Sequence, residues 1–305
     1  MTTLAHISDL HFGRIDPAAV EPLIDDLFQL KPDLIVISGD LTQRARQGQY
    51  QDARRLLERM PIPQIIVPGN HDVPLFSVLR RSFDPYGRFR QFITGDEYPE
   101  FENGDVHIVG INTACRLAPR LGGFWKDGKI RPRHLKALER IFGAVSSPPC
   151  AQGGGKGKGS FVATNVQAHE SPSPQPPPGV SGGGVETPIR ILVAHHPFIE
   201  PPGGHRHGTI HGGGRAVLSL ERLGINLILG GHIHLSYHGD LRRKYPQLPR
   251  AIINVLAGSA TSTRRREAHC AYNVLRVGNR VCTLSVRRLM GTQWVASDEL
   301  GLAIS

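Results

Sequence analysis

The stretch Leu4-Ala5-His6-Ile7-Ser8-Asp9-Leu10-His11 joins a run of apolar residues to side chains of the types that bind metal ions. Four more segments repeat this order, with metal-binding residue types directly after an apolar run: Gly39-Asp40, Gly69-Asn70-His71-Asp72, His195-His196 and Gly231-His232-Ile233-His234. Short runs rich in Ile, Val and Leu predict buried strands. Because an α/β sheet gathers its functional residues at the carboxyl ends of its strands, we expect the five segments to meet at one edge of a sheet.

Helical periodicity fills the intervals between these runs. The predicted helices cover residues 18–30, 49–59, 73–83, 86–93, 131–145 and 215–223. Strands that alternate with helices predict an α/β fold with a largely parallel sheet and helices outside it. Further strands predicted at 251–256, 272–277 and 280–286, with turn residues at Gly278-Asn279, indicate a second, mostly antiparallel sheet packed on the first.

The segment from Ser146 to Pro188 interrupts this pattern. It is rich in glycine, proline and serine and has almost no residues that could be buried. Such a composition predicts a flexible insertion. Since metal-binding residue types lie on both sides of it, we interpret residues 1–305 as a single catalytic domain that this insertion interrupts.

The composition favours a globular protein with an anionic partner. With 39% hydrophobic and 20% charged residues, the chain resembles ordinary globular domains, and no stretch has the ~20 apolar residues of a membrane-spanning helix. The formal net charge of +10 favours a phosphate-bearing partner and leaves nucleic acid or an anionic lipid open. Four cysteines without paired spacing and the lack of a signal-peptide pattern after Met1 predict a cytoplasmic location.

Taken together in order, the motifs Asp9-x-His11, Gly39-Asp40, Gly69-Asn70-His71-Asp72, His195-x-Pro197 and Gly231-His232-x-His234 resemble those of the calcineurin-like metallophosphoesterase superfamily. This resemblance implies a four-layer α/β/β/α sandwich of two mixed sheets, with a dinuclear metal site at the carboxyl ends of the strands. It also implies a role for each matching residue. Asp9, His11 and His234 would bind one metal ion, Asn70, His195 and His232 would bind a second, and Asp40 would bridge the two.

Two further histidines have implied roles outside the ligand set. His71 matches the family's histidine next to the scissile phosphate, where it can donate a proton to the leaving oxygen. His196 occupies a variable position and is assigned to the substrate pocket. In the glycine- and histidine-rich stretch from Pro201 to Arg215, Arg206 and Arg215 are candidates for contacts with substrate phosphate.

The donor set indicates the reaction class. Two divalent ions ~3.5–4 Å apart can stabilise the attacking and leaving oxygens of an in-line displacement, and a hydroxide that bridges them is a strong nucleophile. Imidazole and carboxylate ligands suit Mn²⁺, Fe or Zn²⁺. We therefore expect a metal-dependent phosphohydrolase that acts on a small phosphate ester, and the resemblance favours a phosphodiesterase similar to bacterial cyclic-nucleotide and glycerophosphodiester phosphodiesterases.

Three alternative functions are compatible with the same fold. The first is a nucleotide-sugar or lipid pyrophosphatase. The second is a DNA nuclease, but nothing after Gly231–His234 is long enough for the capping domain of the repair nucleases. The third is a non-catalytic scaffold, which is disfavoured because every ligand position is filled.

Overall fold

The computed structural model describes residues 1–74, 77–115, 128–143, 187–202 and 208–304. Most of the predicted insertion and Arg206 lie outside these ranges. Every site residue named above other than Arg206 lies within them. No described helix is both long enough and apolar enough to cross a lipid bilayer.

The first sheet is built around the strand that carries Asp9. Its order is β12-β11-β10-β1-β2-β3, with β13 paired to β11. Within it, β1 runs parallel to β2, with Leu4 opposite Leu34, and antiparallel to β10, with Leu4 opposite Leu275. The bounds of its strands are β1 Thr2–Ile7, β2 Leu34–Ile37, β3 Gln64–Ile66, β10 Ala271–Gly278, β11 Val281–Met290, β12 Gln293–Ala296 and β13 Leu300–Leu302.

The second sheet carries the histidine motifs. Its order is β4-β5-β6-β7-β9-β8, in which β5, β6, β7 and β9 run parallel and the two edge strands are antiparallel to their neighbours. The bounds of its strands are β4 Glu100–Glu102, β5 Val106–Gly110, β6 Ile189–Val193, β7 Ile225–Gly230, β8 Tyr237–Asp240 and β9 Ile253–Leu256. Both sheets are therefore mixed, as expected.

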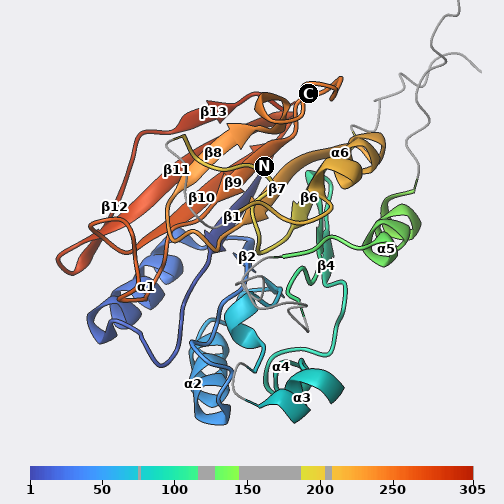
Figure 1. The fold of residues 1–305 in the computed structure, drawn as a ribbon. Coiled ribbons are helices and arrows are strands. Elements are labelled where there is room, and N and C mark those ends of the chain that lie inside the picture. Colours follow the sequence, from blue (N-terminus) through green and yellow to red (C-terminus); the bar gives the residue numbers. More distant parts are fainter. Residues whose placement is uncertain (75–76, 116–127, 144–186, 203–207, 305) are drawn as a thin grey trace, which may run out of the picture. The chain divides into compact units, whose positions relative to one another are not determined.

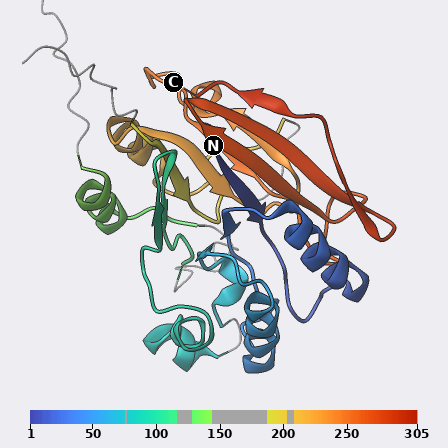
Figure 2. The same ribbon diagram turned by 180° about the vertical axis from the view of Figure 1, so that it is seen from behind.

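The helices are α1 Pro17–Leu30, α2 Gln47–Glu58, α3 Val78–Phe83, α4 Gly87–Phe92, α5 Pro132–Phe142 and α6 Gly213–Arg222. Figures 1 and 2 show how they lie around the two sheets. The first, α1, begins at the side chain of Asp16, which accepts a hydrogen bond from the N–H of Ala18, with Pro17 in the first turn.

Three hydrophobic cores define the four layers. In one core, Leu23 of α1 and Tyr50 of α2 are buried with Ile7 and Ile37 of the first sheet. In the second, residues of both sheets meet, for example Leu4 and Ile191. In the third, α5 and α6 cover the other face of the second sheet, where Leu138 and Val217 pack against Ile228. The order of layers is helices, sheet, sheet, helices, and the expected α/β/β/α sandwich is confirmed.

One expectation about the topology was wrong. The last predicted strands do not form a separate antiparallel sheet. Instead, β9 joins the second sheet parallel to β7, whereas β10 and β11 extend the first sheet from the edge of β1. The physical reason is burial on both faces of β10, where Leu275 packs between the sheets and Tyr272 packs towards α1 and α2.

Helix boundaries also differ in one place that concerns the site. The predicted helix at 73–83 begins at Val78, and the preceding residues Asn70–Asp72 form a separate 3₁₀ turn. This turn directly follows Gly69, in the loop after β3, so a tight turn places the side-chain amide of Asn70.

Candidate metal centre

The loops after five strands bring all seven predicted ligand residues together. Asp9 and His11 follow β1, Asp40 follows β2, Asn70 follows β3, His195 follows β6, and His232 and His234 follow β7. Donor atoms of Asp9, His11 and His234 lie within 4.8 Å of one another, and so do those of Asp9, Asp40 and His195. The first and second sheets therefore contribute to one cluster, which we call the metal centre.

The distances divide this cluster into two poles. At one pole, Nε2 of His11 lies 3.3 Å from Nε2 of His234 and 3.5 Å from Oδ1 of Asp9. Two atoms that bind the same ion at about 2.1 Å, with angles of 90–110°, lie about 3.0–3.4 Å apart. These atoms therefore have spacings close to those of ligands that share one ion.

The second pole is formed by His232 and Asn70, where Nδ1 of His232 lies 2.9 Å from Oδ1 of Asn70. Asp40 lies between the poles, since its Oδ2 is 3.7 Å from Nε2 of His11 and 3.4 Å from Nε2 of His195. A carboxylate in this position can contact ions on both sides.

The backbone at this cluster is unusual. Asp9, His11, Asp40, His232 and His234 all have positive φ, between 53° and 74°. Non-glycine residues rarely adopt this conformation, although Asp and His tolerate it better than most. Because the conformation is unfavourable, it persists only where the surrounding structure holds it, and such residues concentrate at functional sites.

The side chains of this cluster are buried, and some of their polar atoms have no hydrogen-bond partner among the described residues. Asp9, His11 and His195 are fully buried, and Asp40 is 1% exposed. Among the described atoms, Oδ1 of Asp9 and Nε2 of His195 lack a hydrogen-bond partner. Buried carboxylates and unpaired buried polar atoms carry a large desolvation cost unless they coordinate metals or pair with other groups. The donor set and its orphaned atoms therefore fit metal ions.

Hydrogen bonds orient the ligand atoms towards the centre. Nδ1 of His195 lies 2.7 Å from the carbonyl oxygen of Ser38, so Nδ1 carries a proton, and Nε2, which lies 3.4 Å from Oδ2 of Asp40, is the atom that a metal ion would bind in place of a second proton. Oδ1 of Asp40 accepts a hydrogen bond from the N–H of His71, and Oδ2 of Asp9 accepts one from the N–H of His232.

The charges within the cluster reinforce one another. Burial raises the pKa of a carboxyl group, but the imidazoles of His195 and His71 hold the pKa of Asp40 well below its usual range. Burial lowers the pKa of His195, but the carboxylate of Asp40 outweighs it and raises this pKa to about 9. Asp40 is therefore an anion at neutral pH, which suits a group that binds cations.

Asp72 supports the metal centre, although the sequence analysis did not assign it such a role. Asp72 directly precedes the predicted helix at 73–83, where an aspartate can cap a helix, but its buried carboxylate accepts hydrogen bonds from the N–H groups of Leu41, Thr42 and Gly69. It thereby fixes the loop after β2 against the loop after β3. A signal was present, because Asp72 directly follows the Asn-His pair in the motif.

The histidine assigned to the substrate pocket is buried beside the ligands. Nδ1 of His196 lies 2.8 Å from Oγ1 of Thr113, and its ring centroid is 4.7 Å from that of His232. Its donor atoms group with those of His195 and His232 within 4.8 Å. His196 therefore forms part of the wall behind the second pole.

A cavity of about 70 Å³ opens above the metal centre, lined by Asp40, Asn70, His71, His232, His234, Arg264 and Arg266. His71 lies at its edge, where Nδ1 is 2.8 Å from the carbonyl oxygen of Gln43. Arg215, a predicted phosphate contact, is exposed on α6 and is not among the residues that line this cavity. Arg264 and Arg266, on either side of Arg265 in a run of three arginines, line the cavity instead, and the sequence analysis did not single them out.

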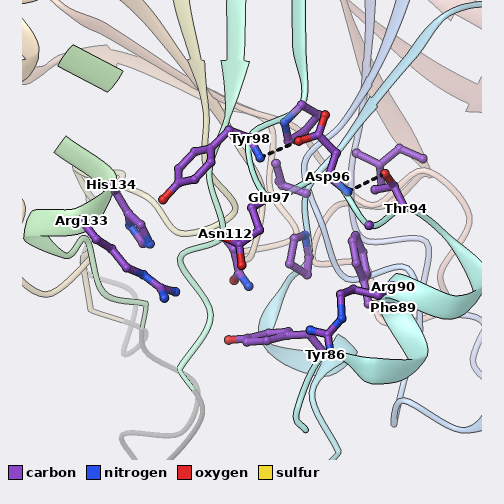
Figure 3. Close-up of a pocket in the computed structure, with 15 residues that line it drawn as sticks. Tyr86, Phe89, Arg90, Thr94, Asp96, Glu97, Tyr98, Asn112, Arg133 and His134 are labelled. Carbon is purple, nitrogen blue, oxygen red and sulfur yellow. Dashed lines mark hydrogen bonds between the residues drawn. The ribbon is translucent and has the colours of Figure 1, made fainter. Parts of the chain in front are cut away.

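A second pocket, of about 60 Å³, shares no lining residue with this cavity. In Figure 3, Tyr86, Phe89 and Arg90 of the α4 region lie on one side of it, and Arg133 and His134 of α5 lie on another. Its rim is a turn in which Asp96 accepts a hydrogen bond from the N–H of Tyr98.

Comparison with curated proteins finds partial matches to bacterial phosphodiesterases. The chain is 33% identical over 158 residues to a probable cyclic nucleotide phosphodiesterase of Synechococcus, which is 48% of this chain and 54% of that protein. It is 40% identical over 80 residues to the glycerophosphodiester phosphodiesterase GpdQ of Enterobacter lignolyticus, which is 23% of this chain and 29% of that protein. The chain thus spans about half or less of the length of these relatives.

Solved structures share the fold at low identity. A dimetal phosphatase from Danio rerio superposes with a TM-score of 0.57 at 12% identity, over 100% of this chain and 99% of that one. Purple acid phosphatase PPD1 from yellow lupin gives the same TM-score and identity over 98% of this chain and 53% of that one. The model of the calcineurin-like phosphoesterase family matches residues 2–236, a span that contains all seven residues of the metal centre. The chain therefore belongs to the calcineurin-like phosphoesterase family.

Proposed function

We propose that this protein is a metal-dependent phosphodiesterase that acts on a small phosphodiester. The observation that carries this proposal is the buried cluster of seven donor residues, arranged in two poles with Asp40 between them. Family membership and the names of the phosphodiesterase relatives support the same reaction. A cyclic nucleotide or a glycerophosphodiester fits these names.

In this proposal Asp9, His11 and His234 hold one metal ion, and Asn70, His195 and His232 hold the other. Asp40, which lies between the two poles, would be shared by both ions. When bound, two divalent ions of Mn, Fe or Zn would activate water and neutralise the charge of the phosphate. Asn70 supplies a neutral oxygen ligand, which limits the negative charge that an incoming phosphate meets.

His71 is proposed as the proton donor to the leaving oxygen. Its ring lies at the edge of the cavity, 4.9 Å from the ring of His11 between centroids. The N–H of its backbone is bonded to Asp40, so the position of the ring depends on the same carboxylate that joins the poles.

The test is hydrolysis of bis-p-nitrophenyl phosphate by the purified protein with added Mn²⁺, together with metal analysis. The variants Asp40→Asn and His232→Gln should lower kcat/KM by about 10³-fold or more and reduce the bound metal. Asp52→Asn, on the exposed face of α2, and His238→Gln, on β8, change the same residue types away from the cavity and serve as controls. Wild-type protein that binds no metal and leaves the reporter intact would refute the proposal.

We also propose that the chain is one catalytic domain and that residues 146–186 are dispensable for the reaction. The described ranges before and after this segment both contribute to the metal centre, with Asp9 from one and His234 from the other. Replacing residues 146–186 by a short glycine-serine linker should change kcat/KM by less than tenfold, or about 1.4 kcal/mol. A larger loss would place this segment in the substrate site. Cytoplasmic location stays a prediction, which fractionation of cells that express the protein would check.

A further inference from the structure

The second pocket lies between α4 and α5, at the edges of both sheets (Figure 3). It is lined from the end of β3, an edge strand of the first sheet, and from the loop before β4, an edge strand of the second. Its volume of about 60 Å³ is several times the roughly 10–15 Å³ that a single water molecule requires. The pocket therefore has room for a ring-sized group.

Aromatic side chains form much of the wall of this pocket. Phe89 is buried, and Tyr86 and Tyr98 are half-buried. The hydroxyl of Tyr86 donates to the carbonyl oxygen of Ala114 across 2.8 Å, which fixes its ring. The rings of Tyr98 and His134 lie edge to face, with their centroids 6.5 Å apart. Aromatic rings held in this way favour a planar ligand, because a flat ring can stack on their faces or meet their edges.

His134 presents a hydrogen-bond donor in this wall. Its side chain is 1% exposed, and Nδ1 accepts a hydrogen bond from the N–H of Arg131. Burial, together with the charges of Arg131 and Arg133, lowers the pKa of His134 to about 4, so the neutral ring carries its proton at Nε2. Among the described residues this N–H has no acceptor. A buried donor without an acceptor costs free energy, which a ligand in the pocket would recover.

Other polar side chains of the pocket also lack a partner among the described residues. They are the hydroxyl of Tyr98, the guanidinium of Arg133 and the carboxylate of Glu97. Arg90 differs from them, because it pairs with Asp84 outside the pocket. The groups that are available to a ligand therefore include both donors and an acceptor.

The charges of the pocket cancel. Its charged side chains are two of each sign, Arg90, Arg133, Asp96 and Glu97. An anion would meet the carboxylate of Glu97, and a cation would meet the guanidinium of Arg133, so either would place like charges together. A neutral ligand avoids both contacts.

We propose that the second pocket binds a nucleobase, which is a neutral planar ring with both donors and acceptors along its edge. The aromatic side chains provide the surface for stacking. Glu97 accepts a hydrogen bond from an amino group of the base, and His134 and Arg133 donate to its ring nitrogen or carbonyl acceptors. This inference goes beyond the proposed function, because the pocket shares no lining residue with the cavity of the metal centre.

The contacts that hold the loop of Asp9 lie outside this pocket. The hydroxyl of Ser259 donates to the carbonyl oxygen of Asp9 across 2.7 Å, and the hydroxyl of Thr261 donates to that of Leu10 across 3.0 Å. These four residues do not line the second pocket. Substitution of exposed residues in the pocket should therefore leave the metal centre intact.

The binding test uses 2-aminopurine riboside, whose fluorescence falls when the base stacks on aromatic rings. Titration with wild-type protein should give a saturable decrease, and adenosine should displace the probe. Purine riboside lacks the amino group and should bind about fivefold more weakly or worse, because Glu97 then has no donor. The absence of a saturable change, or equal affinities for the two ribosides, would overturn the inference.

Variants of two exposed residues show whether the probe lies in this pocket. Glu97→Ala and Arg133→Ala should each weaken binding of 2-aminopurine riboside by about fivefold or more. Glu97→Ala should also abolish the preference over purine riboside, which a general change of shape would not do. Glu139→Ala and Arg140→Ala remove the same residue types from exposed positions of α5 outside the pocket and are the matched controls. Wild-type affinity in both pocket variants would refute the inference.

A nucleotide separates two sources of the base, a free nucleoside and a nucleotide whose phosphate reaches the metal centre. For the second source, added Mn²⁺ should tighten binding of adenosine 5′-phosphate about tenfold or more relative to adenosine, and Asp40→Asn should remove that gain. Equal affinities support the base site with a nucleoside as its ligand. Binding of 2-aminopurine riboside should be the same in wild type and Asp40→Asn, whether or not the protein hydrolyses a diester. Its loss in Asp40→Asn would place the ligand at the metal centre and overturn the inference.

Discussion

The Nη1 atom of Arg264 donates a hydrogen bond to Nε2 of His71 across 3.1 Å. On the other side of the ring, Nδ1 lies 2.8 Å from the carbonyl oxygen of Gln43, which can only accept a hydrogen bond. Nδ1 therefore carries the proton, and the neutral ring presents a lone pair at Nε2. His71 must take up a second proton at Nε2, and Arg264 must move aside, before the ring can protonate a leaving group.

If His71 is the proton donor, the fall in kcat caused by replacing it should depend on the leaving group of the substrate. We expect His71→Gln to lower kcat by about 10²–10⁴-fold for a diester with a poor, alkoxide leaving group. The loss should be clearly smaller for bis-p-nitrophenyl phosphate, because nitrophenolate leaves without a proton. Steady-state kinetics on both substrates make the comparison. An equal loss on both would indicate that His71 acts on the phosphate oxygens and not as an acid.

Asp72 should be required for the shape of the metal centre. Asp72→Asn keeps the size of the side chain but places an amide group against N–H donors of Leu41, Thr42 and Gly69. We expect a loss of about 2–4 kcal/mol in the free energy of unfolding, since buried donors lose their acceptor. Urea denaturation followed by circular dichroism measures it. Asp52→Asn is the surface control, and similar midpoints for the two variants would contradict this role.

Gly69 should not tolerate a side chain, for a steric reason. A Cβ at this position would collide with the backbone nitrogen and the carboxylate of Asp40. Gly69→Ala should therefore displace the carboxylate of Asp40 and lower the amount of bound metal. Gly48→Ala in α2 is the matched control, because a Cβ there meets open space and alanine favours a helix by up to about 1 kcal/mol. Full metal binding by Gly69→Ala would contradict this prediction, because it would show that the loop after β3 can move to accommodate the methyl group.

His134 should make the fold sensitive to mild acid. Burial, together with the charges of Arg131 and Arg133, lowers the pKa of His134 from 6.5 to about 4. Between these values the unfolded chain binds a proton that the folded protein does not, so stability falls as the pH falls from 6.5 towards 4. His134→Gln should show a smaller drop in the free energy of unfolding over this range. Urea denaturation at several pH values between 6.5 and 4 measures it, and an equal fall in the free energy of unfolding for wild type and His134→Gln would exclude the effect.

The positions of the seven donor residues could be predicted because each signal is local. An apolar run predicts a strand, and the residues directly after Ile7, Ile37 or Leu229 must lie at its end, whatever the strand pairs with. The end of a parallel strand is also where sites gather. Metal-binding residue types at several such ends therefore predict a cluster before any pairing is known.

The parts that could not be predicted depend on distant contacts. Whether Leu275 packs between the sheets is decided by the pairing of β10 with β1, which no local pattern encodes. Arg264 reaches the cavity because its loop is bonded to residues about 250 positions earlier, such as Asp9 and Arg14. Asp72 looked like a helix cap because its partners, Leu41 and Thr42, belong to another loop.

The bond between Ser259 and the carbonyl oxygen of Asp9 has a consequence for how the protein is made in the cell. During translation the N-terminus of the chain leaves the ribosome first, and domains generally fold as whole units. The last donor residue, His234, leaves the ribosome before Ser259 and before β10, the partner of β1, have been synthesised. A nascent chain can therefore carry every donor and still lack the contacts that hold Asp9 and His11 in their left-handed backbone conformation. Metal loading should follow chain release, so the metal supply matters after translation and not during it.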